Sequence, residues 1–169
     1  AQAGNDLGPD EAAFIKARDS FYMATVSETG WPYVQHRGGP AGFLAVTGPA
    51  TMVFADYQGN RQYISKGNLS GDPRVAIILM DYPNQQRLKI LGRAKVTPWD
   101  GVDEGLRRAV HRPGAKGRPE RVITIEVAGF DWNCPQHVTR RFTLQEVTEM
   151  VTPLRERILE LERQLAAKG

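Results

Sequence analysis

Apolar and polar residues alternate in short segments along most of the chain. Between Arg87 and Val96, apolar residues and Gly92 occupy every second position, and Lys or Arg stands at most positions between them. This period of two is typical of a strand with one face in a core. Strands are predicted at 21–27, 31–37, 43–47, 52–56, 74–80, 87–96 and 122–128. Such a series, punctuated by Gly and Pro, predicts an antiparallel barrel or sandwich rather than a strand–helix–strand repeat.

Other segments carry helical signals. Asp10 is a candidate N-cap for a helix over 11–19, and short helices are predicted at 65–71 and 101–110. The apolar run 75–80 is uninterrupted, which predicts a strand covered on both faces.

The last segment, 143–169, has a different pattern. Thr143 and Glu146 form a capping-box pair at a helix start. Pro153 interrupts the segment, so we predict two helices in line, with Thr152 as N-cap of the second. Apolar residues recur there at spacings of three and four, as in a coiled coil, and this apolar seam comprises Leu144, Val147, Val151, Leu154, Ile158, Leu161 and Leu165. We expect the seam to cover the barrel; the alternative is packing against a second subunit.

Composition adds limits. The chain has 169 residues, 41% hydrophobic and 24% charged, with a net charge of +3, which describes an ordinary globular domain and no nucleic-acid binder. The single cysteine, Cys134, favours a reducing compartment. No signal-peptide pattern and no run of about 20 apolar residues occurs, so we expect a cytoplasmic protein without a membrane partner.

Several common sites are absent from the sequence. It contains no dinucleotide-binding or P-loop glycine motif, no C-x-x-C and no H-E-x-x-H. The histidines, His36, His111 and His137, are far apart and lack the spacing of a metal site. We expect no metal.

One segment has the chemistry of an anion site. It begins near Asp56, turns at Gly59 and enters the predicted helix at 65–71. Its donors are Asn60, Arg61, Gln62, Ser65, Lys66 and Asn68, and Arg61 could hold a phosphate through two hydrogen bonds beside a helix N-terminus. The alternative is a solvated turn before an ordinary capped helix.

Two other segments have functional and structural interpretations. In the first, Gln35, His36, Arg37 and Gly38 end a strand, where glycines permit close approach of a flat ligand; alternatively this is a loop with a surface arginine. In the second, the segment with Trp132, Cys134, Gln136 and His137 could be a buried corner, with Trp132 in the core and Cys134 as an inert small hydrophobic residue; the functional interpretation of this segment comes from the resemblance below.

The order of these pieces resembles the pyridoxamine 5′-phosphate oxidase-like family of FMN-binding split barrels. The resemblance extends from about Phe14 to Phe142, and four stretches carry it: FYMATVSETGWPYVQHRGGPAGFL, FADYQGNRQYISKGNL, DPRVAIILMDYPNQQRLKILGRAKV and FDWNCPQH. It implies a mainly β fold with flanking helices (α+β), namely a six- to seven-stranded antiparallel split β-barrel over residues 1–142, followed by C-terminal helices over 143–169.

The resemblance also implies residue roles in a cytoplasmic homodimer with composite FMN sites. The strand with Gln35, His36, Arg37 and Gly38 would run beside the flavin ring; Asn60, Arg61 and Gln62, helped by Ser65 and Lys66, would bind its phosphate. The partner would supply Arg87 and the loop with Trp132, Gln136 and His137. Cations Arg37, Arg87 and Lys89 would favour reduced flavin. Asp56 and Asn68 complete the candidate cofactor-binding set.

The C-terminus departs from the oxidases. Their final strand carries an arginine and histidine motif for substrate phosphate, whereas Arg140 and Arg141 precede helices here. The resemblance therefore implies an FMN-dependent oxidoreductase acting on a small organic substrate or a nicotinamide donor, without naming the substrate. Alternatives are a deazaflavin-dependent reductase and a non-catalytic flavin- or haem-binding stress protein.

Overall fold

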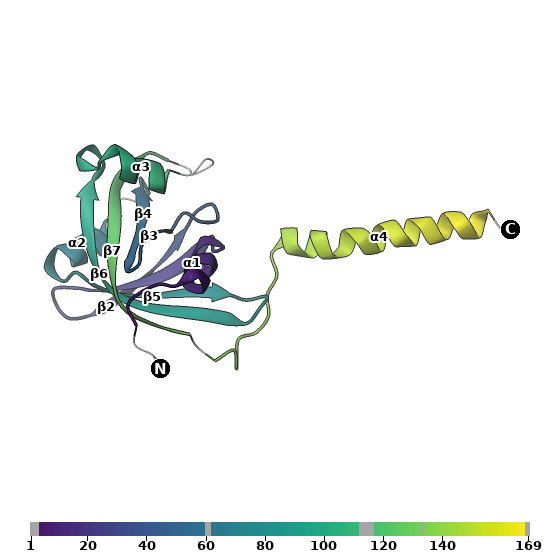
Figure 1. Ribbon diagram of the computed structural model, residues 1–169, viewed down its shortest axis with the longest axis horizontal. Helices are drawn as coiled ribbons and strands as arrows, with labels where there is room; N and C mark the ends of the chain where they lie inside the picture. The colour runs from purple at the N-terminus through teal and green to yellow at the C-terminus, as the bar shows by residue number, and fades with distance from the viewer. Residues whose placement is uncertain (1–3, 60–61, 112–116, 133, 168–169) are drawn as a thin grey trace.

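The fold is one antiparallel sheet of seven strands with helices around it (Figure 1), as the sequence predicts. The computed structural model describes residues 4–59, 62–111, 117–132 and 134–167. The strands lie in the order β2-β1-β5-β6-β7-β4-β3. Their bounds are β1 Ser20–Val26, β2 Pro32–Gly38, β3 Ala45–Gly48, β4 Thr51–Tyr57, β5 Arg74–Asp81, β6 Gln86–Pro98 and β7 Pro119–Trp132.

The two longest strands, β6 and β7, run through both halves of the sheet. Their pairing shifts register between Leu91 and Gly92. A Cβ on Gly92 would stand 2.7 Å from the carbonyl oxygen of Glu126, closer than side-chain carbons approach backbone. Glycine at this position therefore lets the backbone of β7 stay close to β6 where the register of the two strands shifts.

The core lies on the inner face of the curved sheet. The Phe21 ring of β1 is stacked on Phe43, with centroids 5.4 Å apart, and meets Phe54 of β4 edge-on at 5.3 Å. These rings join two strands that are not neighbours in the sheet, β1 and β4. The guanidinium of Arg37 lies 5.8 Å from the centroid of Phe54, so the aromatic core extends to a charged group of β2.

The prediction that residues 75–80 are covered on both faces is wrong for the single chain. The alternate residues Val75, Ile77 and Leu79 are buried, whereas Ala76 is exposed. Ala76 pairs with Ala24 on one side and Leu91 on the other. The apolar run therefore places Ala76, Ile78 and Met80 on the outer face, where they are exposed or half-buried in the single chain.

Three short helices and one 3-10 turn flank the sheet. They are α1 (Pro9–Lys16), α2 (Ile64–Gly71), η1 (Trp99–Gly101) and α3 (Glu104–Val110). The first begins earlier than predicted, because Gly8 is its N-cap and its backbone N–H donates to Glu11. Asp103 is the N-cap of α3, and its side chain accepts a hydrogen bond from the backbone N–H of Leu106. The helix predicted at 101–110 therefore begins only at Glu104, and Gly101 belongs to η1.

The C-terminal segment forms a single helix, α4 (Leu144–Ala166), where two helices were predicted. Pro153 lies inside it. Thr152 does not act as an N-cap: its hydroxyl donates to the carbonyl of Thr148, one turn earlier, so the helix continues through the proline. The helix projects away from the sheet (Figure 1), and none of its described residues is buried. The apolar seam therefore does not cover the barrel of its own chain.

None of the described helices combines the length and the apolar composition that crossing a membrane requires.

A partly buried ion pair holds the chain where α1 meets the β5–β6 hairpin. The guanidinium of Arg18 lies 2.9 Å from a carboxylate oxygen of Asp81. Asn84 donates its backbone N–H and its side-chain amide to the same carboxylate. Burial raises the pKa of Asp81, but the bonds from Asn84 and the charge of Arg18 outweigh it and keep the pKa below its ordinary value.

Replacing this carboxylate should destabilise the fold. We expect Asp81→Asn to lower the free energy of unfolding by about 3 kcal/mol near neutral pH, because Arg18 loses its partner. Since the folded pKa is lowered, this stabilisation is complete above the unfolded pKa of about 3.9 and is lost as pH falls through the folded value. Urea denaturation at several pH values measures the difference.

Asp72→Asn is the matched control. Asp72 also pairs with an arginine, Arg74, at 2.6 Å, and this bond lowers its pKa to about 2, but the pair lies at the surface. Solvent screens such a pair, so stability should change little. A loss in Asp81→Asn no greater than in Asp72→Asn would contradict the role assigned to the buried pair.

Candidate functional site

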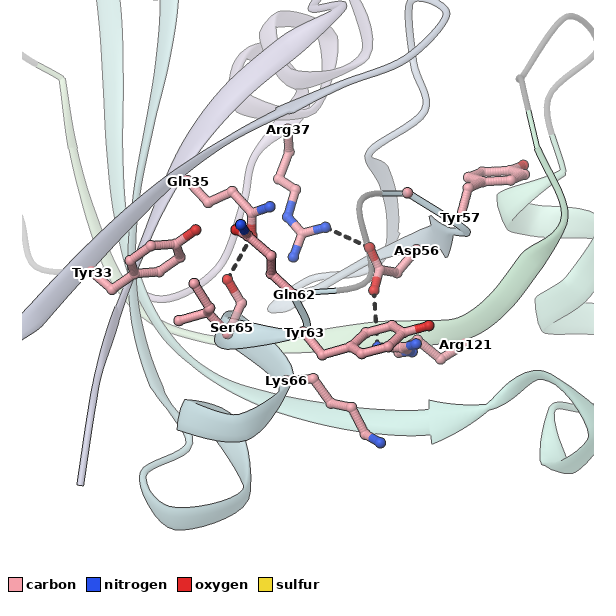
Figure 2. Close-up of a pocket in the computed structure, with 12 residues that line it drawn as sticks. Tyr33, Gln35, Arg37, Asp56, Tyr57, Gln62, Tyr63, Ser65, Lys66 and Arg121 are labelled. Carbon is pink, nitrogen blue, oxygen red and sulfur yellow. Dashed lines mark hydrogen bonds and ion pairs between the residues drawn. The ribbon is translucent and has the colours of Figure 1, made fainter.

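A polar pocket opens where β2, β4, β7 and the start of α2 converge. Its volume is about 260 Å³. Figure 2 shows the side chains of these four elements turned toward one another. The lining residues are Tyr33, Gln35, Arg37, Asp56, Tyr57, Gly59, Gln62, Tyr63, Ile64, Ser65, Lys66 and Arg121. We call it the arginine pocket.

One carboxylate holds the two arginines of the pocket. Arg37 of β2 donates to one oxygen of Asp56, and Arg121 of β7 lies 3.4 Å from the other oxygen. Arg121 also donates to its neighbour Glu120. Only 9% of the Arg121 side chain and 16% of the Arg37 side chain are exposed, so both cations are largely withdrawn from water. Asp56 therefore sets the positions of two cations from different strands.

Both guanidiniums keep hydrogen-bonding capacity inside the pocket. Nε of Arg37 is buried and has no hydrogen-bond partner among the described residues. Nη1 of Arg121 is also buried; it faces Asp56 at 3.4 Å but makes no hydrogen bond among those residues. A buried donor without a partner is costly and rare in folded proteins. The described lining also carries Lys66, so three cations face the carboxylate of Asp56, while Glu120 beside the pocket pairs with Arg121 as a second carboxylate. An anion entering the pocket would satisfy both the donors and the excess charge.

The first turn of α2 forms one wall of the pocket. Ile64, Ser65 and Lys66 line it, and no side chain caps this helix start. Tyr63, just before the helix, has a left-handed backbone conformation with φ of 52°. Its ring lies 4.7 Å from the guanidinium of Arg121, and its hydroxyl donates to Glu120. Tyr63 therefore covers Arg121 while the helix start, where backbone N–H groups and the helix dipole favour anions, faces the pocket.

The structure brings together six of the predicted site residues. Ser65 donates to the side chain of Gln35 over 2.8 Å, which joins the β2 wall to the α2 wall. The six residues that line the pocket are Gln35, Arg37, Asp56, Gln62, Ser65 and Lys66. Asn60 and Arg61, which the sequence proposes for phosphate binding, lie outside the described residues.

The other predicted residues lie away from the pocket in the single chain. His36 faces the opposite side of β2, 5.4 Å from the Tyr22 ring, and Gly38 ends that strand. Asn68 donates to Thr25. The remaining five belong to β6 or to the end of β7 and the loop beyond it: Arg87 donates to the carbonyl of Cys134, Lys89 pairs with Asp131, Trp132 donates to Glu11, and Gln136 and His137 are exposed.

Sequence reasoning missed Arg121. It follows a basic loop and opens an alternating strand, where it reads as one surface cation among several. Its pairing with Asp56 comes from the register of β4 and β7, in which these two residues are direct partners. Asp56 was already a candidate from the sequence. Knowing that β4 and β7 pair in this register would therefore have pointed to Arg121.

Comparison with known proteins identifies the family. Residues 7–130 match the family model described as pyridoxamine 5′-phosphate oxidase. The chain belongs to the pyridoxamine 5′-phosphate oxidase family. No curated protein sequence matches the chain.

Solved structures share the fold of this oxidase family member at low sequence identity. A pyridoxamine 5′-phosphate oxidase-like protein of Lactobacillus delbrueckii is 19% identical, with a TM-score of 0.56, over 76% of this chain and 95% of that one. HupZ of Group A Streptococcus is 15% identical, with a TM-score of 0.58, over 80% and 98%. An FMN-binding protein of Syntrophomonas wolfei is 10% identical, with a TM-score of 0.56, over 74% and 85%.

The shared carboxylate of the arginine pocket can be tested with inorganic phosphate. Asp56→Asn should lower the free energy of unfolding by about 3 kcal/mol, because two largely buried cations lose their common partner. Added phosphate should raise the melting temperature of this variant more than that of the unmodified protein, since the pocket then holds one more net positive charge. Thermal melts over a phosphate series at constant ionic strength measure both effects.

Glu104→Gln controls for the loss of a carboxylate. Glu104 pairs with Arg108 at the surface, one helical turn away, and both side chains are mostly exposed. Its melting temperature should follow that of the unmodified protein at each phosphate concentration. Equal phosphate responses in Asp56→Asn and Glu104→Gln would show that the pocket does not bind the anion.

Proposed function

We propose that this protein is an FMN-binding flavoprotein and that the arginine pocket holds the flavin phosphate. The observation that carries the proposal is the pair of buried guanidiniums of Arg37 and Arg121: Nε of Arg37 has no hydrogen-bond partner among the described residues, and Nη1 of Arg121 faces Asp56 at 3.4 Å without a hydrogen bond. The two arginines belong to different strands, and both contact the carboxylate of Asp56. The start of α2, which no side chain caps, lines the same pocket. A phosphate ester, with several acceptor oxygens and a charge near −2, suits such donors better than a neutral ligand.

Family membership supports flavin among the ligands that carry a phosphate. The match to the family model spans residues 7–130 and so includes every element that lines the arginine pocket. One structure with the same fold is an FMN-binding protein by name. The charged and hydrogen-bonding residues of the pocket fit the phosphate of FMN, so the proposal needs no donor beyond the described lining.

Bound FMN would supply hydride or electron transfer, with a small organic substrate or a nicotinamide donor as the other reactant. The protein's own groups would hold the cofactor. Arg37 and Arg121 would bind the phosphate, the first turn of α2 would face it, and Gln35, fixed by Ser65, would stand along the same wall. In this proposal the enzyme is an oxidoreductase whose chain contributes orientation and charge.

We propose further that the protein is a homodimer with composite flavin sites. The pocket volume of about 260 Å³ is below the roughly 300–1,000 Å³ of typical small-molecule sites, which leaves the flavin ring to be covered from elsewhere. On the outer face of the sheet, Val34, Ala24, Ala76 and Leu91 form one continuous row across β2, β1, β5 and β6. Val34 and Leu91 are each 60% exposed, and such an apolar face suits an interface.

Comparing FMN with riboflavin tests the phosphate role. Riboflavin lacks the phosphate, so we expect the unmodified protein to bind FMN more tightly. Arg121→Gln should weaken FMN binding roughly 10- to 100-fold and leave riboflavin affinity unchanged, because the lost contact is a charge-assisted hydrogen bond. Quenching of flavin fluorescence during titration measures both dissociation constants.

Arg108→Gln is the matched control, since it removes an exposed arginine that pairs only with Glu104 among the residues described. Its FMN affinity should equal that of the unmodified protein. Equal affinities of the unmodified protein for FMN and riboflavin would overturn the placement of the phosphate. A purified protein with a Soret band, or one that binds no flavin, would overturn the flavin assignment itself.

The proposed dimer predicts a link between association and cofactor retention. Leu91→Glu places a charge in the apolar row, so the dissociation constant of the dimer should rise. FMN occupancy should fall as the dimer is lost. Sedimentation velocity, followed at both protein and flavin absorbance, measures the two quantities on one sample.

Lys95→Gln, an exposed position on the same strand with the same change in net charge, is the control. It should leave mass and occupancy unaltered. A Leu91→Glu protein that is monomeric and still binds FMN as tightly as the unmodified protein would show that each chain holds a complete site.

A further inference from the structure

The apolar seam of α4 contains no buried residue in the single chain, and all of its members except the half-buried Val151 are exposed. Leu154 is 63% exposed, Ile158 54% and Leu165 75%. A seven-residue repeat describes the seam: Leu144, Val151, Ile158 and Leu165 occupy the first (a) position, and Val147, Leu154 and Leu161 the fourth (d). A helix with such a seam is stabilised by burying it against another helix.

We propose that α4 pairs with α4 of a second copy of this chain as a parallel, two-stranded coiled coil. This interaction surface is separate from the arginine pocket and from the outer face of the sheet, and it goes beyond the proposed flavin function. The two copies would contribute the same residues, so each a and d side chain would meet its own counterpart.

The identity of the seam residues favours two parallel strands. β-Branched residues at a, combined with leucine at d, favour parallel dimers over higher oligomers. In the middle of α4 the a positions are Val151 and Ile158, and the d positions are Leu154 and Leu161. The central layers of the seam therefore have the composition of a two-stranded coiled coil.

Charges beside the seam are complementary in the parallel arrangement. There, each g residue faces the e residue five positions further along the other helix, so Arg157 faces Glu162 of the second copy. Arg157 bonds Glu160 within its own helix at 2.7 Å, whereas Glu162 has no ion-pair partner among the described residues. In the antiparallel arrangement that overlaps α4 along its full length, Arg155 would face Arg155 and Arg157 would face Arg157. Like charges would then repel at the centre.

Pro153 is compatible with this pairing. It occupies a c position, on the side of α4 away from the seam, so its ring does not enter the interface. The hydroxyl of Thr152, at b, bonds back to the helix on the same side. The proline ring therefore lies on the solvent side of the proposed pair.

The chain just before α4 is attached to the barrel. Gln85 of the β5–β6 hairpin donates to the carbonyl of Val138 and accepts from Arg140. The guanidinium of Arg141 stacks over Tyr82 of the same hairpin, with 5.1 Å to the ring centroid. Pairing of two α4 helices would thus fix the two barrels at their hairpin ends.

Disulfide trapping in the full-length protein tests the pairing. In a Cys134→Ser background, which removes the native cysteine, Leu154→Cys places one thiol at the seam and Glu156→Cys places one at f, on the opposite side of the helix. Under mild oxidation we expect covalent dimers to form about tenfold faster from Leu154→Cys, because its thiols face each other across the seam. Equal rates at the two positions would overturn the proposal.

Helix direction is tested by mixing two single-cysteine proteins, Val151→Cys and Leu161→Cys. In the parallel pair these positions are far apart, so each protein should cross-link only with itself. Mixed dimers in excess of the self-linked ones would overturn the parallel arrangement.

Charge reversal gives an independent test in the Leu154→Cys background. Glu162→Arg should slow trapping roughly two- to tenfold, and adding Arg157→Glu should restore it, since the pair is then present with its signs exchanged. Glu156→Arg, at f, is the control and should leave the rate unchanged. Failure of the double variant to recover would contradict the predicted contact. FMN content, measured in the same samples, should not change in any variant, which separates this result from the fate of the flavin proposal.

Discussion

The carboxylate of Asp56 is the contact on which the arginine pocket depends. Without it, Arg37 of β2 and Arg121 of β7 would be two largely buried cations facing one cavity, and their repulsion and desolvation would oppose the fold. With it, β2, at one edge of the sheet, is tied to β4 and β7 near the other. Nε of Arg37 has no hydrogen bond among the described residues, and Nη1 of Arg121, 3.4 Å from Asp56, has an ion pair but no hydrogen bond there. The ion pair thus ties distant strands of the curved sheet together at the pocket that we propose for the flavin phosphate.

Local pattern was sufficient to predict the strands and most helices. The alternation between Arg87 and Val96 depends only on one buried face, and β6 includes that whole segment. Burial of both faces at 75–80 was predicted incorrectly. Apolar residues such as Ala76 and Ile78 are expected both under a helix of the same chain and on a face that another surface covers, so their sequence does not distinguish the two cases. The C-terminus failed for a related reason. Pro153 ends many helices, but here the local backbone tolerates it, and that depends on bonds such as the one from Thr152 that sequence spacing does not specify.

The candidate site was predictable where function and local sequence coincide. Ser65 and Lys66 follow directly from a donor-rich segment at a helix start, and Gln35 and Arg37 from a strand end. Arg121 was not predictable in this way, since its role arises from pairing between β4 and β7, more than sixty residues apart in sequence. Arg87, Lys89 and the loop with Gln136 and His137 come from the family resemblance, and their proposed contacts involve a second chain. They remain predictions about the dimer.

The backbone of Tyr63 has an energetic consequence for this site. A left-handed conformation costs a tyrosine of the order of 1 kcal/mol or more, and glycine would adopt it without that cost. Glycine, however, would remove the ring over Arg121 and admit water to the guanidinium. The ring contact with Arg121 and the hydroxyl bond to Glu120 therefore offset a backbone cost at position 63. In the site that we propose, the same ring would keep water away from a cation that binds the flavin phosphate.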